Sequence, residues 1–364
     1  MTVNDIAKVL EELAPLAHAE DFDNVGLLVG DPNMKVEGAL VTLDTLENVV
    51  DEAIAKECNL IISFHPIIFN GLKRLTGATY VERVVLKAVA NNIAIYSMHT
   101  ALDNSKMGVN AKICEVLGIK NPQILIPRSK SIKKLTTYAP VADAENIKQE
   151  LFKAGAGEIG NYSNCSFSLE GTGSFKAGNG ANPTVGKLGE VHFEKETQIN
   201  VIYSFEREKS ILNALFEAHP YEEVAYEVLT LENSNQDLGM GMIGTLDTEM
   251  DEKEFLIRTK ERLNAKVVRH SELLGKRVNK VAVLGGSGAF AIGAAKNAGA
   301  DVFISADMKY HDFYQAENQL VIADMGHFET EQFTKDLLVD YLTKKIPNFA
   351  VSLSESITNP IKYL

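Results

Sequence analysis

Residues 60–66 read LIISFHP, a short apolar run that ends in a histidine. Two similar runs lie at residues 39–43, ALVTL, and 93–98, IAIYSM. Each is nearly continuous in apolar residues, which is typical of strands buried on both faces, as in parallel sheets. Apolar residues at helical spacing separate these runs, at 46–56 and at 80–91. The alternation of strand and helix predicts a layered α/β fold.

The last third of the chain repeats this pattern. It contains apolar runs that predict strands and periodic stretches that predict helices. The predicted strands are 280–284, 301–305 and 319–323, and the predicted helices are 289–298 and 329–341.

The middle of the chain differs from both ends. Its strand candidates alternate in polarity, glycine and asparagine cluster at 171–173 and 178–183, and helices are expected at 144–154 and 209–219. This order is typical of a small β-α-β-β-α-β module.

We therefore expect one core α/β domain, with mostly parallel sheets, that is built from two separate segments of the chain. These segments are residues 1–130 and 236–364, and residues 131–235 are expected to form an inserted α+β domain of ferredoxin-like type.

Composition narrows the class of protein. The 364 residues carry a net charge of −13, which disfavours non-specific nucleic-acid binding. No stretch has the roughly 18 uninterrupted apolar residues of a membrane helix, and the first residues do not resemble a secretory signal. The three cysteines are far apart and form no C-x-x-C pair, which fits a reducing compartment. We expect a soluble cytoplasmic protein.

Polar residues follow three of the predicted strands. His65 follows the first, His99 and Asp103 follow the second, and His327 and Glu331 follow the third. Ligands of open α/β sheets bind beyond the carboxyl ends of strands, so these residues could converge in one cleft. The alternative for each is a hydrogen-bonded structural histidine or a solvated helix face.

The spacing of His327 and Glu331, i and i+4, places both on one face of a helix, whereas Glu329 points elsewhere. An imidazole and a carboxylate from one turn commonly hold zinc, iron or manganese. Asp103 could bridge two ions through its two oxygens, and paired ions support hydrolytic chemistry. The pattern predicts a divalent-metal site with one or two ions.

A competing motif follows the strand at 280–284. Residues 286–291 read GSGAFA and fit G-x-G-x-x-A, with Asp307 near the end of the next strand. That pattern is typical of dinucleotide-binding proteins. Since no second mononucleotide-binding half follows, we favour a tight turn whose free backbone amides face the cleft.

At these residues the chain resembles a known family, the NGG-interacting-factor-three-like dinuclear metal proteins, also labelled GTP cyclohydrolase I type 2 homologues. The resemblance covers essentially the whole chain, and its matching segments are 21–30 DFDNVGLLVG, 63–69 SFHPIIF, 98–103 MHTALD, 285–288 GGSG and 326–331 GHFETE.

The resemblance implies that His65, Asp103, His327 and Glu331 are metal ligands. The family has two adjacent histidines where this chain has Phe64 and His65, so one of two ions would lose a protein ligand, which water or His99 could replace.

Two further histidines, His99 and His311, are implied as groups that orient ligands or transfer protons, with His99 the candidate catalytic residue. Phe22 also departs from the family, since it stands where the family has tryptophan.

The inserted domain resembles the CutA/PII-like signalling fold. The resemblance lies in residues 219–223, HPYEE, and in the turn at 171–175, GTGSF. It implies a module that assists assembly or gates the cleft, and the family resemblance implies a homo-hexamer.

Three functions stay open. The first is a metal-dependent hydrolase of an unknown small molecule, of GTP cyclohydrolase type by family label only. The second is a non-catalytic metal-binding or regulatory oligomer. The third is a nucleotide-binding oxidoreductase that depends on Gly286 and Asp307.

Overall fold

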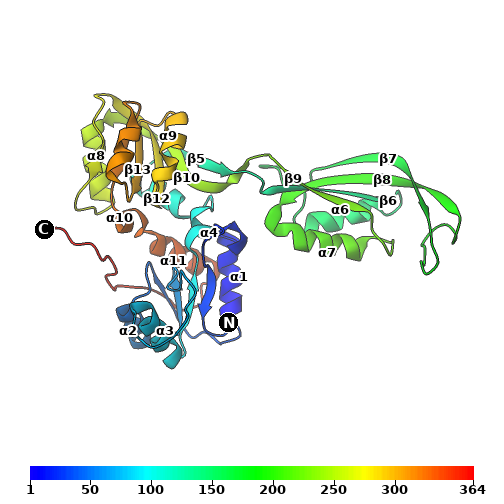
Figure 1. The fold of residues 1–364 in the computed structure, drawn as a ribbon, viewed down its shortest axis with the longest axis horizontal. Coiled ribbons are helices and arrows are strands. Elements are labelled where there is room, and N and C mark those ends of the chain that lie inside the picture. The colour runs from blue at the N-terminus through cyan, green and yellow to red at the C-terminus, as the bar shows by residue number, and fades with distance from the viewer. The chain divides into compact units, whose positions relative to one another are not determined.

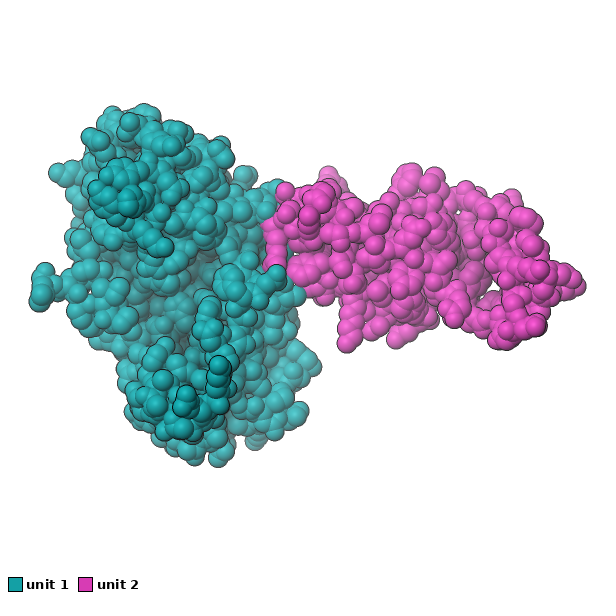
Figure 2. All heavy atoms as spheres, viewed as in Figure 1, with its two compact units in different colours: residues 1–127, 236–364 teal, residues 128–235 magenta.

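The computed structural model describes all 364 residues as two compact units (Figures 1 and 2). Unit 1 comprises residues 1–127 and 236–364, and unit 2 comprises residues 128–235. The fold is mixed α/β with parallel and antiparallel sheets. None of its helices has the length and apolar character that crossing a membrane requires.

The first sheet of unit 1 has five strands in the order β1-β4-β3-β2-β15. Their bounds are β1 Gly26–Val29, β2 Ala39–Thr42, β3 Leu60–Ser63, β4 Ala94–Ser97 and β15 Val351–Leu353. The strands β2, β3 and β4 are parallel and buried on both faces, as the apolar runs predict. The short strand β15, which the sequence did not reveal, pairs the C-terminal segment with β2.

Helices cover both faces of this sheet. They are α1 Val3–Leu13, α2 Glu47–Ala55, α3 Tyr80–Ala90 and α11 Thr334–Lys345. Alternate residues of β2, β3 and β4 enter two separate apolar cores, with Ile61 in one and Ile62 in the other. Thr2 caps α1 reciprocally with Asp5.

The second sheet has six strands in the order β11-β14-β13-β12-β10-β5. Their bounds are β5 Lys120–Arg128, β10 Asn235–Asp251, β11 Arg269–His270, β12 Arg277–Ser287, β13 Val302–Ala306 and β14 Val321–Asp324. The three central strands are parallel, while β10 and β11 pair antiparallel with them. This sheet is therefore mixed, whereas the first is mostly parallel.

The helical segments of this half are short. They are α5 Val109–Leu117, α8 Glu252–Arg262, η3 Ala289–Ala291, α9 Ile292–Asn297, η4 Tyr310–Ala316 and α10 His327–Glu331. The helix predicted over 289–298 is divided into η3 and α9. The single helix predicted over 329–341 is in fact α10 followed by α11. At the break, the side-chain amide of Gln332 donates to the carbonyls of Leu263 and Glu329 and so replaces main-chain bonding there.

Unit 2 has the order β-α-β-β-α-β. Its elements are β6 Ile132–Pro140, α6 Ala144–Lys153, β7 Ser166–Lys176, β8 Val191–Ser204, η2 Phe205–Arg207, α7 Glu208–Ala218 and β9 Tyr226–Leu231. The sheet order is β7-β8-β6-β9, and both long helices cover the same face (Figure 1). Leu135, Ile199 and Val201 point to the helices and are buried, which leaves the other face of the sheet without a helix.

The C-terminal segment beyond β15 is attached through Glu52 of α2. The carboxylate accepts hydrogen bonds from the Ser354 hydroxyl at 2.7 Å and from the amides of Glu355 and Ser356 at 2.8 and 3.0 Å, and it pairs with Lys56 at 2.8 Å. Partial burial raises the pKa of Glu52, but these donors outweigh it and lower the pKa to about 2.

Glu52→Gln is expected to reduce the free energy of unfolding at pH 7 by about 1–2 kcal/mol. Because the folded-state pKa is depressed, the stabilisation exists above pH ~4.5 and is lost as pH falls toward 2. Urea unfolding at a series of pH values should show the difference between wild type and variant shrinking below pH ~4.5. Glu37→Gln, at an exposed carboxylate, is the control. A difference that stays constant with pH would contradict this account of Glu52.

Candidate metal centre

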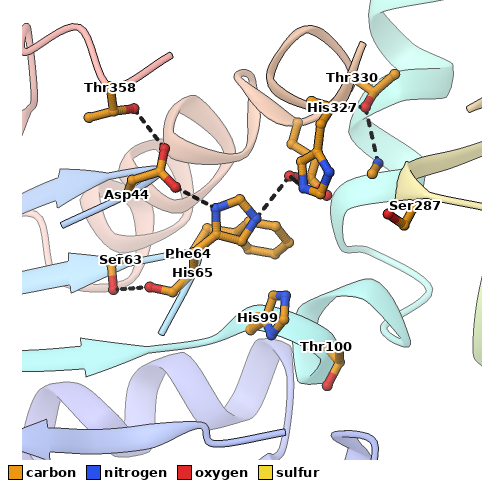
Figure 3. A network of polar contacts seen from close by, with 12 residues as sticks. Asp44, Ser63, Phe64, His65, His99, Thr100, Ser287, His327, Thr330 and Thr358 are labelled. Carbon is orange, nitrogen blue, oxygen red and sulfur yellow. Dashed lines mark hydrogen bonds and ion pairs between the residues drawn. The ribbon is translucent and has the colours of Figure 1, made fainter. Parts of the chain in front are cut away.

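Side chains from the carboxyl ends of both sheets of unit 1 meet in one place (Figure 3). His65 follows β3, and His327 and Glu331 lie at the two ends of α10, which follows β14. His99 and Asp103 are the ends of α4 His99–Asp103, directly after β4. Parallel strands end at the same edge of each sheet, and the contact between His65 and Glu331 joins the two edges.

Three of the four residues predicted as ligands form a close cluster. The Nε2 atoms of His65 and His327 lie 3.0 and 3.1 Å from Oε2 of Glu331. The candidate ligand atoms of the three residues all lie within 4.8 Å of one another. Oε2 is buried, yet neither contact has the geometry of a hydrogen bond. Two imidazole nitrogens and a carboxylate oxygen that converge at ion-pair distance, without hydrogen-bond geometry, suit a divalent cation.

Asp103 lies outside this three-residue group but lines the same cavity. Its Oδ1 is buried and has no hydrogen-bond partner. Burial and the charge of Glu331 raise the pKa of Asp103 well above the usual value. A buried carboxylate oxygen without a donor is unfavourable unless a cation or a proton accompanies it.

Each clustered histidine is oriented by its own carboxylate. Nδ1 of His65 lies 2.7 Å from Asp44, which also accepts a 2.7 Å bond from the Thr358 hydroxyl. Nδ1 of His327 lies 2.7 Å from Asp307. Such a bond at one ring nitrogen fixes the orientation of the imidazole and points the other nitrogen at the ion in metal sites.

The cluster stabilises positive charge. Burial lowers the pKa of His65 and of His327, but the adjacent carboxylates outweigh it and raise these pKa values to about 10 and about 9. Burial raises the pKa of Glu331, while the two imidazoles lower it to about 2. A divalent cation would replace protons at this position, because ligands bind metals in their deprotonated forms.

The glycine turn after β12 lies against Glu331. A Cβ at Gly286 would lie 2.3 Å from Oε1 of Glu331, and Gly286 has φ +65°, a conformation that favours glycine. The amides of Gly285 and Gly286 donate to Asn110 and Thr330, at 3.0 Å each. The sequence-based expectation that these amides are free for an anion is therefore wrong, since both already have partners.

Asp307 also forms its hydrogen bonds within this site. It accepts from the Ser287 hydroxyl as well as from His327. A dinucleotide-binding site would need this carboxylate for a ribose and the glycine amides for phosphate. Both are engaged within the chain, which argues against the oxidoreductase hypothesis.

Phe64 fills the position beside His65. Its side chain is fully buried, and its ring lies 4.9 Å from that of His65 and 5.5 Å from that of His99 (Figure 3). A phenyl ring offers no ligand atom, so the space on this side of the cluster is apolar.

His99, which lines the cavity described below, forms a third carboxylate–imidazole pair. Its Nδ1 lies 2.7 Å from Asp23, which also accepts from the amide of Thr100 at 3.0 Å. Burial raises the pKa of Asp23, but His99 and Thr100 outweigh it and lower the pKa to about 2. The backbone of His99 has φ +24°, an unfavourable value for a residue with a side chain.

A cavity of about 330 Å³ opens over the cluster. Besides His99, Asp103, His327 and Glu331, its lining includes three exposed phenylalanines, Phe22, Phe69 and Phe290. Phe22 and Phe69 contact each other, with ring centroids 6.4 Å apart. Aromatic rings beside a few polar groups are typical of small-molecule sites.

Sequence reasoning missed the orienting carboxylates. Asp44 follows β2 as His65 follows β3, so the same strand-end signal was available for it. His311, predicted to assist the site, is exposed and contacts the rings of Tyr310 and Tyr314 instead.

Known proteins match this chain over nearly its whole length. The sequence profile described as Duf34/NIF3 (NGG1p interacting factor 3) matches residues 1–360. A Bacillus subtilis protein named GTP cyclohydrolase 1 type 2 homolog is 39% identical over 99% of this chain and 98% of its own length. A Staphylococcus epidermidis protein of the same name is 34% identical over the full length of both.

Solved structures of similar proteins share the fold. A Bacillus cereus protein described as related to NIF3 matches with a TM-score of 0.85 and 37% identity, over 100% of this chain and 99% of that chain. A Staphylococcus aureus protein matches with a TM-score of 0.80 and 28% identity over the same shares.

Proposed function

The chain belongs to the Duf34/NIF3 (NGG1p interacting factor 3) family, and from this premise we propose that it binds a divalent metal ion through His65, His327 and Glu331, with Asp103 as a fourth ligand. The observation that carries the proposal is the convergence of two Nε2 atoms on a buried carboxylate oxygen that has no hydrogen bond. The orienting carboxylates Asp44 and Asp307 support it.

We assign one tightly held ion per chain. Phe64 occupies the position from which a second histidine would reach a second ion, and a phenyl ring cannot replace it. The donor set of nitrogen and oxygen atoms suits zinc, iron or manganese.

The function that we assign to the site is hydrolysis of a small molecule. A bound divalent ion supplies Lewis acidity, which polarises a substrate oxygen or lowers the pKa of a water molecule. Asp44 and Asp307 hold the ligand imidazoles in place, and Phe22, Phe69 and Phe290 provide an apolar surface that limits access of water. His99, held through Nδ1 by Asp23, is the group in the cavity that we assign to proton transfer.

We infer the substrate class from the names of the relatives and from the aromatic lining of the cavity. The relatives are named for GTP cyclohydrolase 1 type 2, and a planar heterocycle could stack on the exposed phenylalanines. A screen should therefore include nucleotides, phosphoesters and amides, with zinc, manganese or iron supplied.

Replacing His99 tests the hydrolase assignment. His99→Gln is expected to lower kcat on any substrate found by about a hundredfold or more, because proton transfer by a positioned group contributes that much. Metal per chain should not change. His311→Gln, at an exposed histidine outside the cavity, should leave kcat as in wild type. Loss of metal from His99→Gln would instead make His99 a ligand, and equal kcat in both variants would remove its proposed role.

The alternative is a non-catalytic metal-binding or regulatory protein. The apolar Phe64 favours it, because a site with fewer ligands has less of the machinery of two-ion hydrolysis. A closed ligand sphere without an exchangeable water, together with no turnover in the screen, would select this function.

We also propose that units 1 and 2 are separate domains, that unit 2 is a CutA/PII-like module, and that the chain forms a cytoplasmic homo-oligomer, a hexamer by family resemblance. The β-α-β-β-α-β order supports the second assignment. Exposed Phe167, Leu169 and Phe193 on β7 and β8 support self-association, since such apolar patches usually meet a partner.

A further inference from the structure

Unit 2 contains a cavity of about 490 Å³ that is lined only by its own residues. It is lined by the end of β7, by Glu196 of β8, by Tyr138 of β6 and by residues of the segments 177–185 and 221–225. Its volume lies within the range of small-molecule sites, which is about 300–1,000 Å³. The metal chemistry proposed above makes no use of it.

Three aromatic side chains line this cavity, and the HPYEE segment positions two of them. His219 is buried, and its Nε2 bonds the carbonyl of Tyr138 at 2.9 Å. Its Nδ1 accepts the amide of Tyr221 at 3.1 Å. One imidazole thus forms hydrogen bonds with the main chain of both tyrosines. Phe175 of β7 completes the aromatic lining.

The carboxylate of Glu196 is held in the same cavity. Its Oε1 accepts a hydrogen bond from the hydroxyl of Tyr221 at 3.1 Å. Burial and the nearby Glu196 raise the pKa of Tyr221, so the phenol stays protonated and donates. The other oxygen lies over Gly173, where a Cβ would come within 2.0 Å of Oε2. Only glycine at 173 leaves room for this position of the carboxylate.

The charges around the cavity favour a cation. Glu196, Glu222 and Glu223 line it, against the single cationic side chain of Lys176. Faces of aromatic rings attract cations, and a carboxylate bonds ammonium and guanidinium groups strongly. A carboxylate among three aromatic rings therefore suits a positively charged group on an apolar body.

We propose that this cavity binds a small organic cation, with its ammonium, amidinium or guanidinium group on Glu196 and its apolar part against Tyr138, Phe175 and Tyr221. The site is independent of the metal centre, because every residue that forms it belongs to unit 2.

The test is calorimetric titration of the full chain with three probes of one shape: benzamidine, benzamide and benzoate. Benzamidine is expected to bind, and its neutral isostere benzamide to bind about tenfold more weakly or not at all. Glu196→Gln should weaken benzamidine binding by about tenfold or more, while Glu170→Gln, at an exposed carboxylate of β7 outside the cavity, should not.

A pair of glycine variants separates the site from general damage to the sheet. Gly173→Ala should weaken benzamidine binding as Glu196→Gln does, because the new methyl group displaces the carboxylate. Gly171→Ala, two residues away on the same strand with nothing within 4 Å of its new Cβ, should bind as wild type.

The proposal is overturned by any of three results. They are equal affinity for benzamidine and benzamide, tighter binding of benzoate, which would assign the cavity to anions through Lys176, and no binding of any probe by the wild-type chain.

Discussion

Glu331→Gln is expected to remove nearly all bound metal from the purified protein. The carboxylate oxygen on which both imidazoles converge becomes a neutral amide group, and an amide holds transition-metal ions far less strongly than a carboxylate does. We expect the affinity for zinc to fall by about a hundredfold or more, because the loss of a residue that only orients a ligand already lowers metal affinity by roughly 10–100-fold. The measurement is metal per chain by elemental analysis, before and after reconstitution.

The matched control is Glu329→Gln, on the same helix. Glu329 is also buried, but its Oε1 accepts a hydrogen bond from the side-chain amide of Asn359. It does not belong to the cluster of His65, His327 and Glu331. This variant should keep the metal content of wild type, which we expect near one ion per chain. Near two ions per wild-type chain would mean that Phe64 does not disable a second position. No metal in wild type after reconstitution would remove the central proposal.

Gly286→Ala is expected to weaken the same metal site by displacing the carboxylate of Glu331. A methyl group at 286 would lie 2.3 Å from Oε1 of Glu331 and 3.3 Å from Cε1 of His327, so the carboxylate must move. The backbone at φ +65° adds a strain of roughly 1–2 kcal/mol for a residue with a side chain. We expect a loss of unfolding free energy on the order of 2–3 kcal/mol and a fall in zinc affinity comparable to that of Glu331→Gln.

Gly293→Ala controls for the substitution itself. Gly293 lies exposed in α9, with nothing within 4 Å of an added Cβ. Alanine there should stabilise the chain by about 0.5–1 kcal/mol, since glycine is costly within a helix. Urea unfolding and elemental analysis of both variants give the two readouts. Normal metal content in Gly286→Ala would show that Glu331 tolerates displacement, and the close packing would then have no functional meaning.

The sequence alone predicts the main strands and helices and the polar residues that follow the strands. Continuous apolar runs predict β2, β3 and β4. A strand that is covered on both faces is apolar on both, so its sequence is continuously apolar and does not alternate with polar residues. His65, Asp103, His327 and Glu331 were identifiable because they lie directly after buried strands or within the first turns that follow them, and because the family resemblance implies the same four residues. The i, i+4 spacing of His327 and Glu331 is a local property of one helical turn.

Contacts between distant segments could not be predicted in this way. The bonds from Asp44 to His65 and from Asp307 to His327, and the strand pair of β15 with β2, each join segments whose proximity depends on the sheet order. The glycine motif at 286–288 has the local pattern of a nucleotide-binding turn. Only the packing of Glu331 and the side chains of Asn110 and Thr330 against it decided otherwise.

The sequence by itself therefore predicted which residues could hold a metal, because side-chain chemistry and helical or strand period are local. The tertiary structure decided which of them meet, which oxygens are left buried without a partner, and that Gly173 makes room for Glu196 in unit 2. The physical reason is that burial and contact distance depend on segments far apart in the chain, while sequence periodicity reports only the neighbours along it.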